Sequence, residues 1–475
     1  MKVKFAWMLI AAFVLCGALA DTGTIRAAWF RADITPPVGT KLAGYGSFDI
    51  SVGVADPLEA CGVVLDDGTN RVALISYDIL GLDSATIRDF RQTFAKTLGV
   101  ESKDVMLTCT HTHEGPHTRS YIEGLGDMEL LPGAPARNLD TGYLAKLRRQ
   151  TDDALAEIAQ GKAWKKVRVG FHSTVVDVNL NRNFVTADNC ASFAAYNRKL
   201  AAAGTGYADK ELGVLALFDS DSDSLQPLWV LGNYAAHPLD AHSFGTGGLR
   251  ISADFPGVFR CYLTEETGVA AMFVQGAAGD LFTKYNELGR AGMRKTGEEL
   301  GMAAVGSVLD IQRNADRFVM GRSRVGAVSK HFKSKIRKHY RKYFDRDEID
   351  LEVQCLAVGD VCFVGVPGEA ICELGRQIKW NSPFRKTFIA YCSTGYAGYL
   401  APPNFVAAGG YEGTEQRFAS RDVLKLVNVA TDAAFELRNR LFPEDSDEDG
   451  DAYPDSQRLP LCNLPGMVRP GRFQK

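Results

Sequence analysis

The feature that most constrains the fold is a short apolar segment that leads into a run of histidines. Residues Val105–Cys109 are apolar and β-prone, which predicts a buried strand, and a Gly-Pro pair soon afterwards ends it. Three of the chain's eight histidines, His111, His113 and His117, follow within the nine residues Thr110–Thr118. Polar groups at the carboxyl end of a buried strand are typical of the functional sites of α/β proteins.

The spacing of the first two histidines indicates a metal or catalytic site. In an extended segment residues two apart share a face, so His111 and His113 are expected to point into one cavity. A neutral imidazole is a common zinc ligand. The alternative is a polar loop without any ligand role.

Composition and charge narrow the class of protein. With 475 residues the chain is long enough for one large domain or two modest ones, and its composition is ordinary for a globular protein. The net charge of -3 gives no general attraction to nucleic acid.

The N-terminus predicts export. Lys2 and Lys4 precede an apolar run, Phe5–Leu19, and a small-x-small cleavage pattern follows, so residues 1–20 are interpreted as a secretory signal peptide. We therefore expect a secreted or periplasmic protein. An uncleaved anchor and a lipoprotein acylated at Cys16 are the alternatives.

Nine cysteines remain after such cleavage, scattered and without a Cys-x-x-Cys pair. This pattern argues against a cysteine zinc site. Several lie in apolar runs and are expected to be buried small hydrophobes. Export would permit disulfides, but no pairing follows from the sequence.

Strand and helix patterns alternate along the chain and predict an α/β fold. We expect mixed β-sheets flanked by helices, in a single large catalytic domain over residues 21–442 with its site at strand carboxyl ends. Strands are expected near residues 27–35, 60–65, 72–77, 105–108, 167–172, 213–218, 227–234, 270–274, 351–358, 361–366 and 387–392. Helices are expected near residues 84–98, 141–160, 256–266, 290–314, 370 onward and 423–441.

Two charged segments fit less directly into this pattern. Residues 321–346 are strongly basic and are interpreted as a solvated face or hairpin, with peripheral docking to an anionic membrane as the alternative. Residues 443–475 are expected to form a flexible acidic tail. Its aspartates at alternate positions resemble a calcium-binding loop, although no glutamate occupies the twelfth position, so Ca2+ is the alternative there: Asp445, Asp447, Asp449 and Asp451.

Further polar side chains follow other predicted strands, and they favour metal-dependent hydrolysis. A catalytic zinc takes three or four nitrogen or oxygen ligands and keeps one position for water. Zinc lowers the pKa of water and polarises a carbonyl, which suits cleavage of an acyl or phosphoryl bond. The residues alone leave the type of bond open. The candidates beyond the histidine run are His237, Ser252 with Asp254, Asp280, Glu369 and Tyr399.

Six short motifs occur in one order and together resemble the neutral/alkaline non-lysosomal ceramidase family. They span about residues 28 to 415, and each is weak alone. They are Ala32-Asp33-Ile34-Thr35-Pro36, Thr110-His111-Thr112-His113-x-Gly115-Pro116, Ile251-Ser252-Ala253-Asp254, Gln275-x-x-Ala278-Gly279-Asp280, Pro367-Gly368-Glu369 and Tyr396-Ala397-Gly398-Tyr399 with Tyr411-Glu412-Gly413.

The resemblance implies a zinc-dependent amidohydrolase that cleaves the amide of an N-acylsphingosine or related N-acyl lipid, with one zinc per chain. By position, the implied zinc ligands are His111, His237, Glu369 and Tyr399. His113, Arg182 and Tyr411 would line the site and contact substrate or transition state. Ser252 matches a serine proposed as nucleophile, and zinc-activated water is the other candidate.

The sequence also departs from the family pattern. The usual C-terminal β-sandwich is not expected, and Glu114-Gly115-Pro116-His117 stands where Ser-Gly-Pro-Gly is common. These differences touch the pocket, so the substrate could differ from ceramide. A metallohydrolase of an ester or phosphoester and a non-catalytic binding protein are the alternatives. Structural roles are alternatives for His237 (a strand cap), Ser252 (a helix start), Asp280 (a turn), Arg182 (a surface ion pair) and Tyr396, which is expected to pack.

Overall fold

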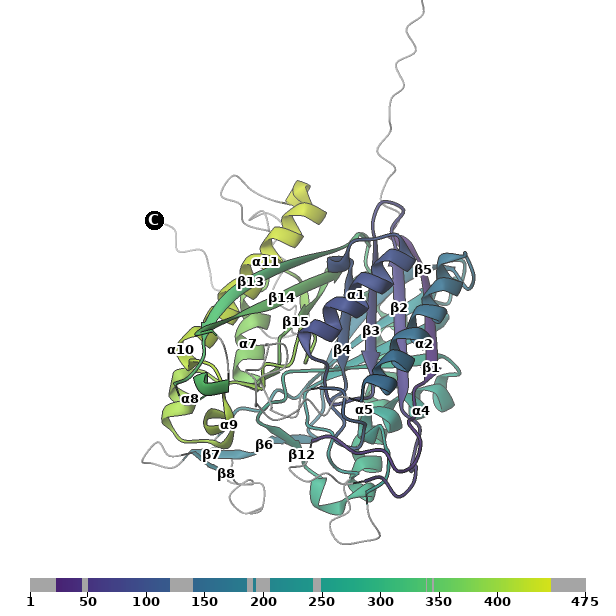
Figure 1. Cartoon of the computed structure of the whole chain (residues 1–475). Coiled ribbons are helices and arrows are strands. Elements are labelled where there is room, and N and C mark those ends of the chain that lie inside the picture. Colours follow the sequence, from purple (N-terminus) through teal and green to yellow (C-terminus); the bar gives the residue numbers. More distant parts are fainter. Residues whose placement is uncertain are drawn as a thin grey trace, which may run out of the picture.

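The described chain is arranged in four layers, in which helices cover two stacked β-sheets on their outer faces (Figure 1). Each pair of adjacent layers shares a cluster of buried apolar side chains, as expected for sheets and helices that bury one face each. The computed structural model describes residues 23–44, 50–119, 140–185, 191–193, 206–241, 249–338, 340–343 and 346–445.

The larger sheet has eight strands and is mixed. All neighbours are antiparallel except the pairs at its two edges, β10 with β11 and β3 with β4, which are parallel. In spatial order the strands are β11 (Ala270–Gln275), β10 (Pro227–Tyr234), β9 (Glu211–Asp219), β5 (Lys165–Val175), β1 (Thr24–Asp33), β2 (Glu59–Asp66), β3 (Arg71–Tyr77) and β4 (Val105–Cys109).

The smaller sheet has four strands, antiparallel except for the parallel pair β15 and β17. Its strands are, in order, β13 (Val325–Lys335), β14 (Glu348–Val358), β15 (Val361–Gly365) and β17 (Lys386–Ala390). Three two-stranded pairs complete the described sheets: β12 (Leu281–Thr283) with β6 (Asn179–Asn181), β16 (Glu369–Ala370) with β18 (Tyr399–Leu400), and β7 (Asn183–Val185) with β8 (Ala191–Phe193).

Several strands of the larger sheet, among them β2 and β3, are buried on both faces because both faces are covered. Along β2, Val63 packs into the core between the sheets, whereas the next residue, Val64, packs against the helices on the other face. Leu74 and Ile75 of β3 divide in the same way. This period of two explains why the predicted strands appear in the sequence as continuous apolar runs.

Long helices cover the outer faces of the two sheets. Helix α1 shows the local causes: Ile87, Phe90, Phe94 and Leu98 recur at helical spacing and are buried, and Gly99 ends the helix in the left-handed conformation (φ 69°). The long helices are α1 (Ser84–Leu98), α2 (Thr141–Ala159), α4 (Asp254–Thr267) and α5 (Arg290–Arg313) on the larger sheet, and α7 (Cys372–Asn381) and α11 (Lys425–Leu441) on the smaller one. The shorter ones are α6 (Ala315–Phe318), α8 (Pro403–Ala407), α9 (Tyr411–Glu415), α10 (Ser420–Val423), η1 (Ser102–Asp104), η3 (Asn286–Leu288), η4 (Arg341–Tyr343) and η5 (Pro443–Asp445).

Tyr391, just after β17, joins the two edges of the larger sheet. Its N–H donates to the carbonyl of Gln275 at the end of β11, and its carbonyl accepts from the hydroxyl of Thr108 in β4. Asn233 of β10 donates to the carbonyls of Val274 and Ile389 at the same place. The carboxyl ends of β4, β10, β11 and β17 therefore lie together, although β4 and β11 are at opposite ends of the strand order.

The predicted α/β architecture of mixed sheets flanked by helices is confirmed. Helix 84–98 and strand 227–234 have the predicted bounds, and the other predicted long elements differ by a few residues. The basic stretch forms β13 and part of its hairpin with β14. None of the described helices combines the length and apolar character needed to cross a bilayer.

Several predictions lie outside the described residues or are not tested. The signal peptide and the tail aspartates after Asp445 lie outside them. Asp445 itself forms ion pairs with Arg322 and Arg438. The seven described cysteines are free thiols. The domain boundary at residue 442 stays a prediction.

Candidate metal centre

His111 and His237 are brought together by the joined edges of the larger sheet. His111 follows β4, and its N–H donates to the carbonyl of Ile79 after the neighbouring strand. His237 follows β10, and its N–H donates to the carbonyl of Leu281. Their ring centroids lie 4.9 Å apart, and each side chain is 1% exposed. His111 has φ 69°, a left-handed conformation that is uncommon for non-glycine residues and that clusters at functional sites.

Hydrogen bonds to backbone carbonyls fix the orientation of both rings. Nδ1 of His111 donates to the carbonyl of Leu80, and Nδ1 of His237 donates to that of Ala278, each over 2.7 Å. Nδ1 therefore carries the proton in both rings, and Nε2 presents its lone pair. This is the arrangement of metal-binding histidines, whose other nitrogen is held by a carbonyl or carboxylate.

The carboxylate of Glu369 faces both rings. Its Oε2 lies 3.5 Å from Nε2 of His111 and 3.4 Å from Nε2 of His237. Glu369 begins β16, after Gly368, whose φ of 154° and close approach to the carbonyl of Gly398 exclude a Cβ. The backbone at Gly368 therefore directs the glutamate toward the histidines.

His113 completes a buried trio with His111 and His237. One ring nitrogen from each of the three side chains lies within 4.8 Å of the other two. A glycine loop packs beside His113: the N–H of Ala43 donates to the carbonyl of Gly115, and a Cβ on Gly44 would lie 2.4 Å from Nδ1 of His113. The predicted pair of neighbouring histidines thus faces one site.

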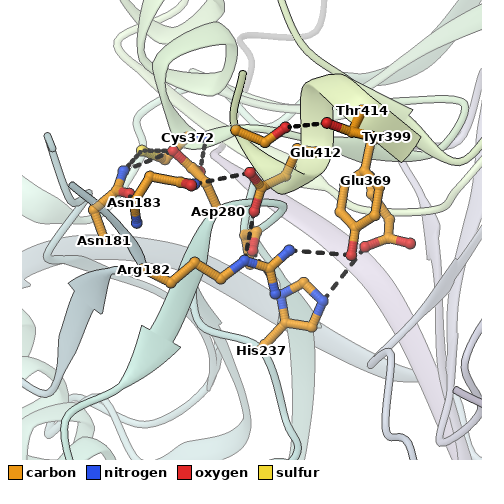
Figure 2. A network of polar contacts seen from close by, with 12 residues as sticks. Asn181, Arg182, Asn183, His237, Asp280, Glu369, Cys372, Tyr399, Glu412 and Thr414 are labelled. Atoms are coloured by element: carbon orange, nitrogen blue, oxygen red, sulfur yellow. Dashed lines mark hydrogen bonds and ion pairs between the residues drawn. The ribbon is translucent and has the colours of Figure 1, made fainter. Parts of the chain in front are cut away.

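Arg182 and Tyr399 form the second half of the site (Figure 2). Arg182 donates from Nε to Glu412 over 2.5 Å and from its terminal nitrogen to the Tyr399 hydroxyl over 3.1 Å. Asn183 donates to the other oxygen of Glu412. Tyr411 lies next to this group, and the centroids of the Tyr411 and Tyr399 rings are 5.6 Å apart. Tyr411 is 41% exposed, whereas Tyr399 is only 7% exposed. Tyr411 therefore stands on the solvent side of the site.

Asp280 stabilises the chain segments next to this part of the site. Its carboxylate accepts hydrogen bonds from the Asn181 side chain and from the N–H of Cys372 at the start of α7 (Figure 2). Burial, followed by the charge of Glu412, raises the pKa of Asp280 to about 6. Asp280 therefore ties β6 to α7 and contacts none of the three histidines through any bond among the described residues.

Burial and the neighbouring side chains together set the charges of the site. It lowers the pKa of His237 to about 4 and holds the pKa of His113 well below its usual value, so both rings are neutral at pH 7. Burial alone would raise the pKa of Glu369, but His111 and His237 outweigh it and lower that pKa well below its ordinary value. The site thus combines two neutral imidazoles, those of His113 and His237, with the ionised carboxylate of Glu369.

Ser252 lies beside the histidine segment but makes structural contacts. Its hydroxyl donates to Asp56 over 2.6 Å and accepts from the N–H of Asp254, which begins α4 with φ 58°. Its carbonyl accepts from the Thr112 hydroxyl. Among the described residues, no hydrogen bond or ion pair links the Ser252 side chain to the three histidines. Ser252 thus lies two residues before Asp254, at which α4 begins, and Ala253 is the N-cap of that helix.

The donor set fits a zinc ion. Two ligands of a tetrahedral zinc at about 2.1 Å from the metal lie roughly 3.4 Å apart. The separations of 3.5 and 3.4 Å between Glu369 and the two Nε2 atoms match this spacing. Both Nε2 atoms are buried without a well-aligned hydrogen bond.

The comparisons with known proteins address the fold. No protein-family model and no curated protein matches the chain. The crystal structure of neutral ceramidase from Pseudomonas aeruginosa matches with a TM-score of 0.68 at 17% identity, over 88% of this chain and 75% of that one. The chain has a neutral ceramidase-like fold. A ceramidase complexed with C2 matches similarly, with a TM-score of 0.67 at 16% identity, over 88% of this chain and 76% of that chain.

The ceramidase-like fold contains site residues that were not predicted from sequence. Glu412, the partner of Arg182, belongs to one of the six motifs but was not predicted as a site residue. Tyr391 and Tyr396 both donate to Glu369, although Tyr396 was expected only to pack. No local signal marks Tyr391, because its contact depends on how β17 joins the larger sheet.

Proposed function

We propose that the chain is a zinc-dependent amidohydrolase that cleaves an N-acylsphingosine or related N-acyl lipid to a fatty acid and an amine. The observation that carries the proposal is the convergence of two oriented imidazoles on the Glu369 carboxylate at tetrahedral ligand spacing. The neutral ceramidase-like fold supports the amide and the lipid. We assign zinc binding to His111, His237, Glu369 and Tyr399.

His113, Arg182 and Tyr411 would transfer protons, stabilise negative charge and contact the substrate, respectively. Zinc, when bound, supplies polarisation of the amide carbonyl and lowers the pKa of water toward neutrality. Neutral His113 beside the other two rings accepts a proton at a ring nitrogen and returns it to the leaving amine. Arg182, held by Glu412, places its positive charge next to the Tyr399 hydroxyl, where it stabilises a developing oxyanion. Exposed Tyr411 contacts the substrate at the entrance.

The test combines metal content with fatty-acid release from a fluorescent N-acylsphingosine. Wild type is expected to hold one zinc per chain, to lose activity with a chelator and to regain it with zinc. His111→Ala should lose both metal and activity. His331→Ala is the matched control, because this histidine is exposed and pairs with Asp350 on the smaller sheet.

Other outcomes identify the alternatives. Zinc without amide cleavage, followed by activity on an ester or phosphoester panel, would assign another bond to the same centre. Absence of zinc together with an unaltered His111→Ala variant would favour a non-catalytic binding protein. We also propose export through residues 1–20, which N-terminal sequencing of the mature protein tests.

A further inference from the structure

The two oxygens of Glu369 have different surroundings. Oε2 faces the Nε2 atoms of His111 and His237, at 3.5 and 3.4 Å. Oε1 accepts a hydrogen bond from the hydroxyl of Tyr396. The side chain is 3% exposed, so this hydroxyl takes the place that water would occupy at an exposed carboxylate. The carboxylate cannot rotate without breaking the contact.

Tyr396 is itself held rigidly. It is 4% exposed, and its ring lies nearly parallel to that of His111, with centroids 6.2 Å apart. The guanidinium carbon of Arg119 lies 4.2 Å from the centre of the ring. On another side, a Cβ on Gly81 would stand 2.5 Å from Cδ2 of the ring, so the backbone there approaches closely. The hydroxyl therefore has a fixed direction.

One segment of chain supplies both a proposed ligand and the support of Tyr396. His111 and Arg119 are eight residues apart, and both contact the Tyr396 ring. A cation over an aromatic face is attracted to the ring and draws electron density from it, which makes the hydroxyl a better donor. The strength of the bond to Glu369 is thereby linked to the histidine segment.

We infer that Tyr396 is a positioning residue, which holds Glu369 so that Oε2 alone is directed at the histidines. This inference rests on the proposed metal site and adds to it a residue that acts through Glu369. Tyr391 has a different role, because its hydroxyl is 3.3 Å from Oε2, the oxygen on the histidine side. Partners of this kind typically change metal affinity by about 10–100-fold.

The experiment compares Tyr396→Phe with wild type in a zinc competition against a chromophoric chelator, without substrate. The variant keeps the ring and removes only the hydroxyl, so the zinc dissociation constant is expected to rise by about 10–100-fold. Tyr143→Phe is the matched control: its hydroxyl is also buried, but it donates to the carbonyl of Ile34. Its zinc affinity should equal that of wild type.

A double-mutant cycle tests whether Tyr396 acts through Glu369. In a Glu369→Ala background, adding Tyr396→Phe should cause no further change in zinc affinity, because the acceptor is gone. An equal loss in both backgrounds would overturn the inference. So would unaltered affinity in Tyr396→Phe, or an apo variant that is unfolded by circular dichroism while Tyr143→Phe folds, since the tyrosine would then serve the core.

The same measurements separate this inference from the proposed function. Wild type that binds zinc but cleaves no amide would refute the proposed reaction, while a weakened Tyr396→Phe would still support the positioning role. If wild type cleaves the amide but Tyr396→Phe binds zinc as tightly as wild type, the proposed function stays supported and the positioning role of Tyr396 is overturned. Wild type without zinc affinity would overturn both.

Discussion

Arg182 and Glu412 allow a stability effect to be separated from a catalytic one. Both side chains are buried, 3% and 0% exposed, and are joined over 2.5 Å. Arg182→Leu would leave a buried carboxylate without its cation, which costs about 3–5 kcal/mol of unfolding free energy. Loss of a group that stabilises an oxyanion typically lowers kcat by about 10²–10³-fold. The single variant should therefore be both less stable and nearly inactive.

The double variant Arg182→Leu/Glu412→Gln should behave differently. The glutamine is neutral and keeps an oxygen for Asn183, so about half or more of the lost stability should return. Activity should stay as low as in the single variant, because the cation is still absent. Urea unfolding and fatty-acid release, measured on the same preparations, give the two quantities.

A second buried ion pair provides the control. Arg91 and Glu352 form an ion pair over 2.8 Å, and their side chains are 5% and 14% exposed. Arg91 lies on α1 and also donates to the carbonyl of Ser102. Arg91→Leu should lower stability comparably and leave kcat unaltered. The reasoning is refuted if the double Arg182 variant regains activity together with stability, or if Arg182→Leu alone costs no stability.

Three further predictions concern other contacts. Gly44→Ala should displace His113 and so lower kcat at least about tenfold. Gly39→Ala is the control, because Gly39 has a comparable φ but open space around its Cβ, and it should keep full activity. Steady-state kinetics of the two variants test this prediction. Ser252→Ala should lower stability by about 1–3 kcal/mol in urea unfolding and alter kcat less than about threefold, and a far larger kcat loss would restore the serine as nucleophile. Burial alone would raise the pKa of Glu211, but two lysines outweigh burial and lower it to about 2, below the unfolded value of 4.5. The ionised carboxylate therefore contributes up to about 3 kcal/mol of stability above pH 4.5, and this contribution is lost as pH falls from about 5 to 2. The destabilisation caused by Glu211→Gln in urea unfolding should shrink across that range, and a constant difference would contradict the assignment.

Local patterns predicted most of the fold. The bounds of α1 follow from apolar residues at helical spacing and from Gly99, all of which lie within one segment of sequence. Strand β4 is bounded by the polar run that begins at Thr110. The short strands β6, β12, β16 and β18 were not predicted, because two or three residues carry no period and their pairing is set by the surrounding tertiary structure.

The site was predictable where its residues end long strands. His111 and His237 follow β4 and β10, and both face Glu369. The hydrogen bond of Tyr396 was not predictable, because it depends on the path of the chain after β17. Ser252 shows the opposite case: its motif suggested chemistry, whereas its hydroxyl donates to Asp56 and accepts from the N–H of Asp254 just before the body of α4.

The junction at Tyr391 explains why the fold concentrates its polar groups at this place. Buried imidazoles, a buried carboxylate and the left-handed His111 all cost free energy, so the surrounding structure must fix them. Tyr391 does so with its backbone, which joins β4 to β11, and its hydroxyl reaches Glu369. Tyr396 reaches the same carboxylate with its hydroxyl. The Tyr391 ring is also fully buried in the core. Loss of the Tyr391 side chain should therefore disturb the core and the site together, whereas loss of the Tyr396 hydroxyl should act on the site alone.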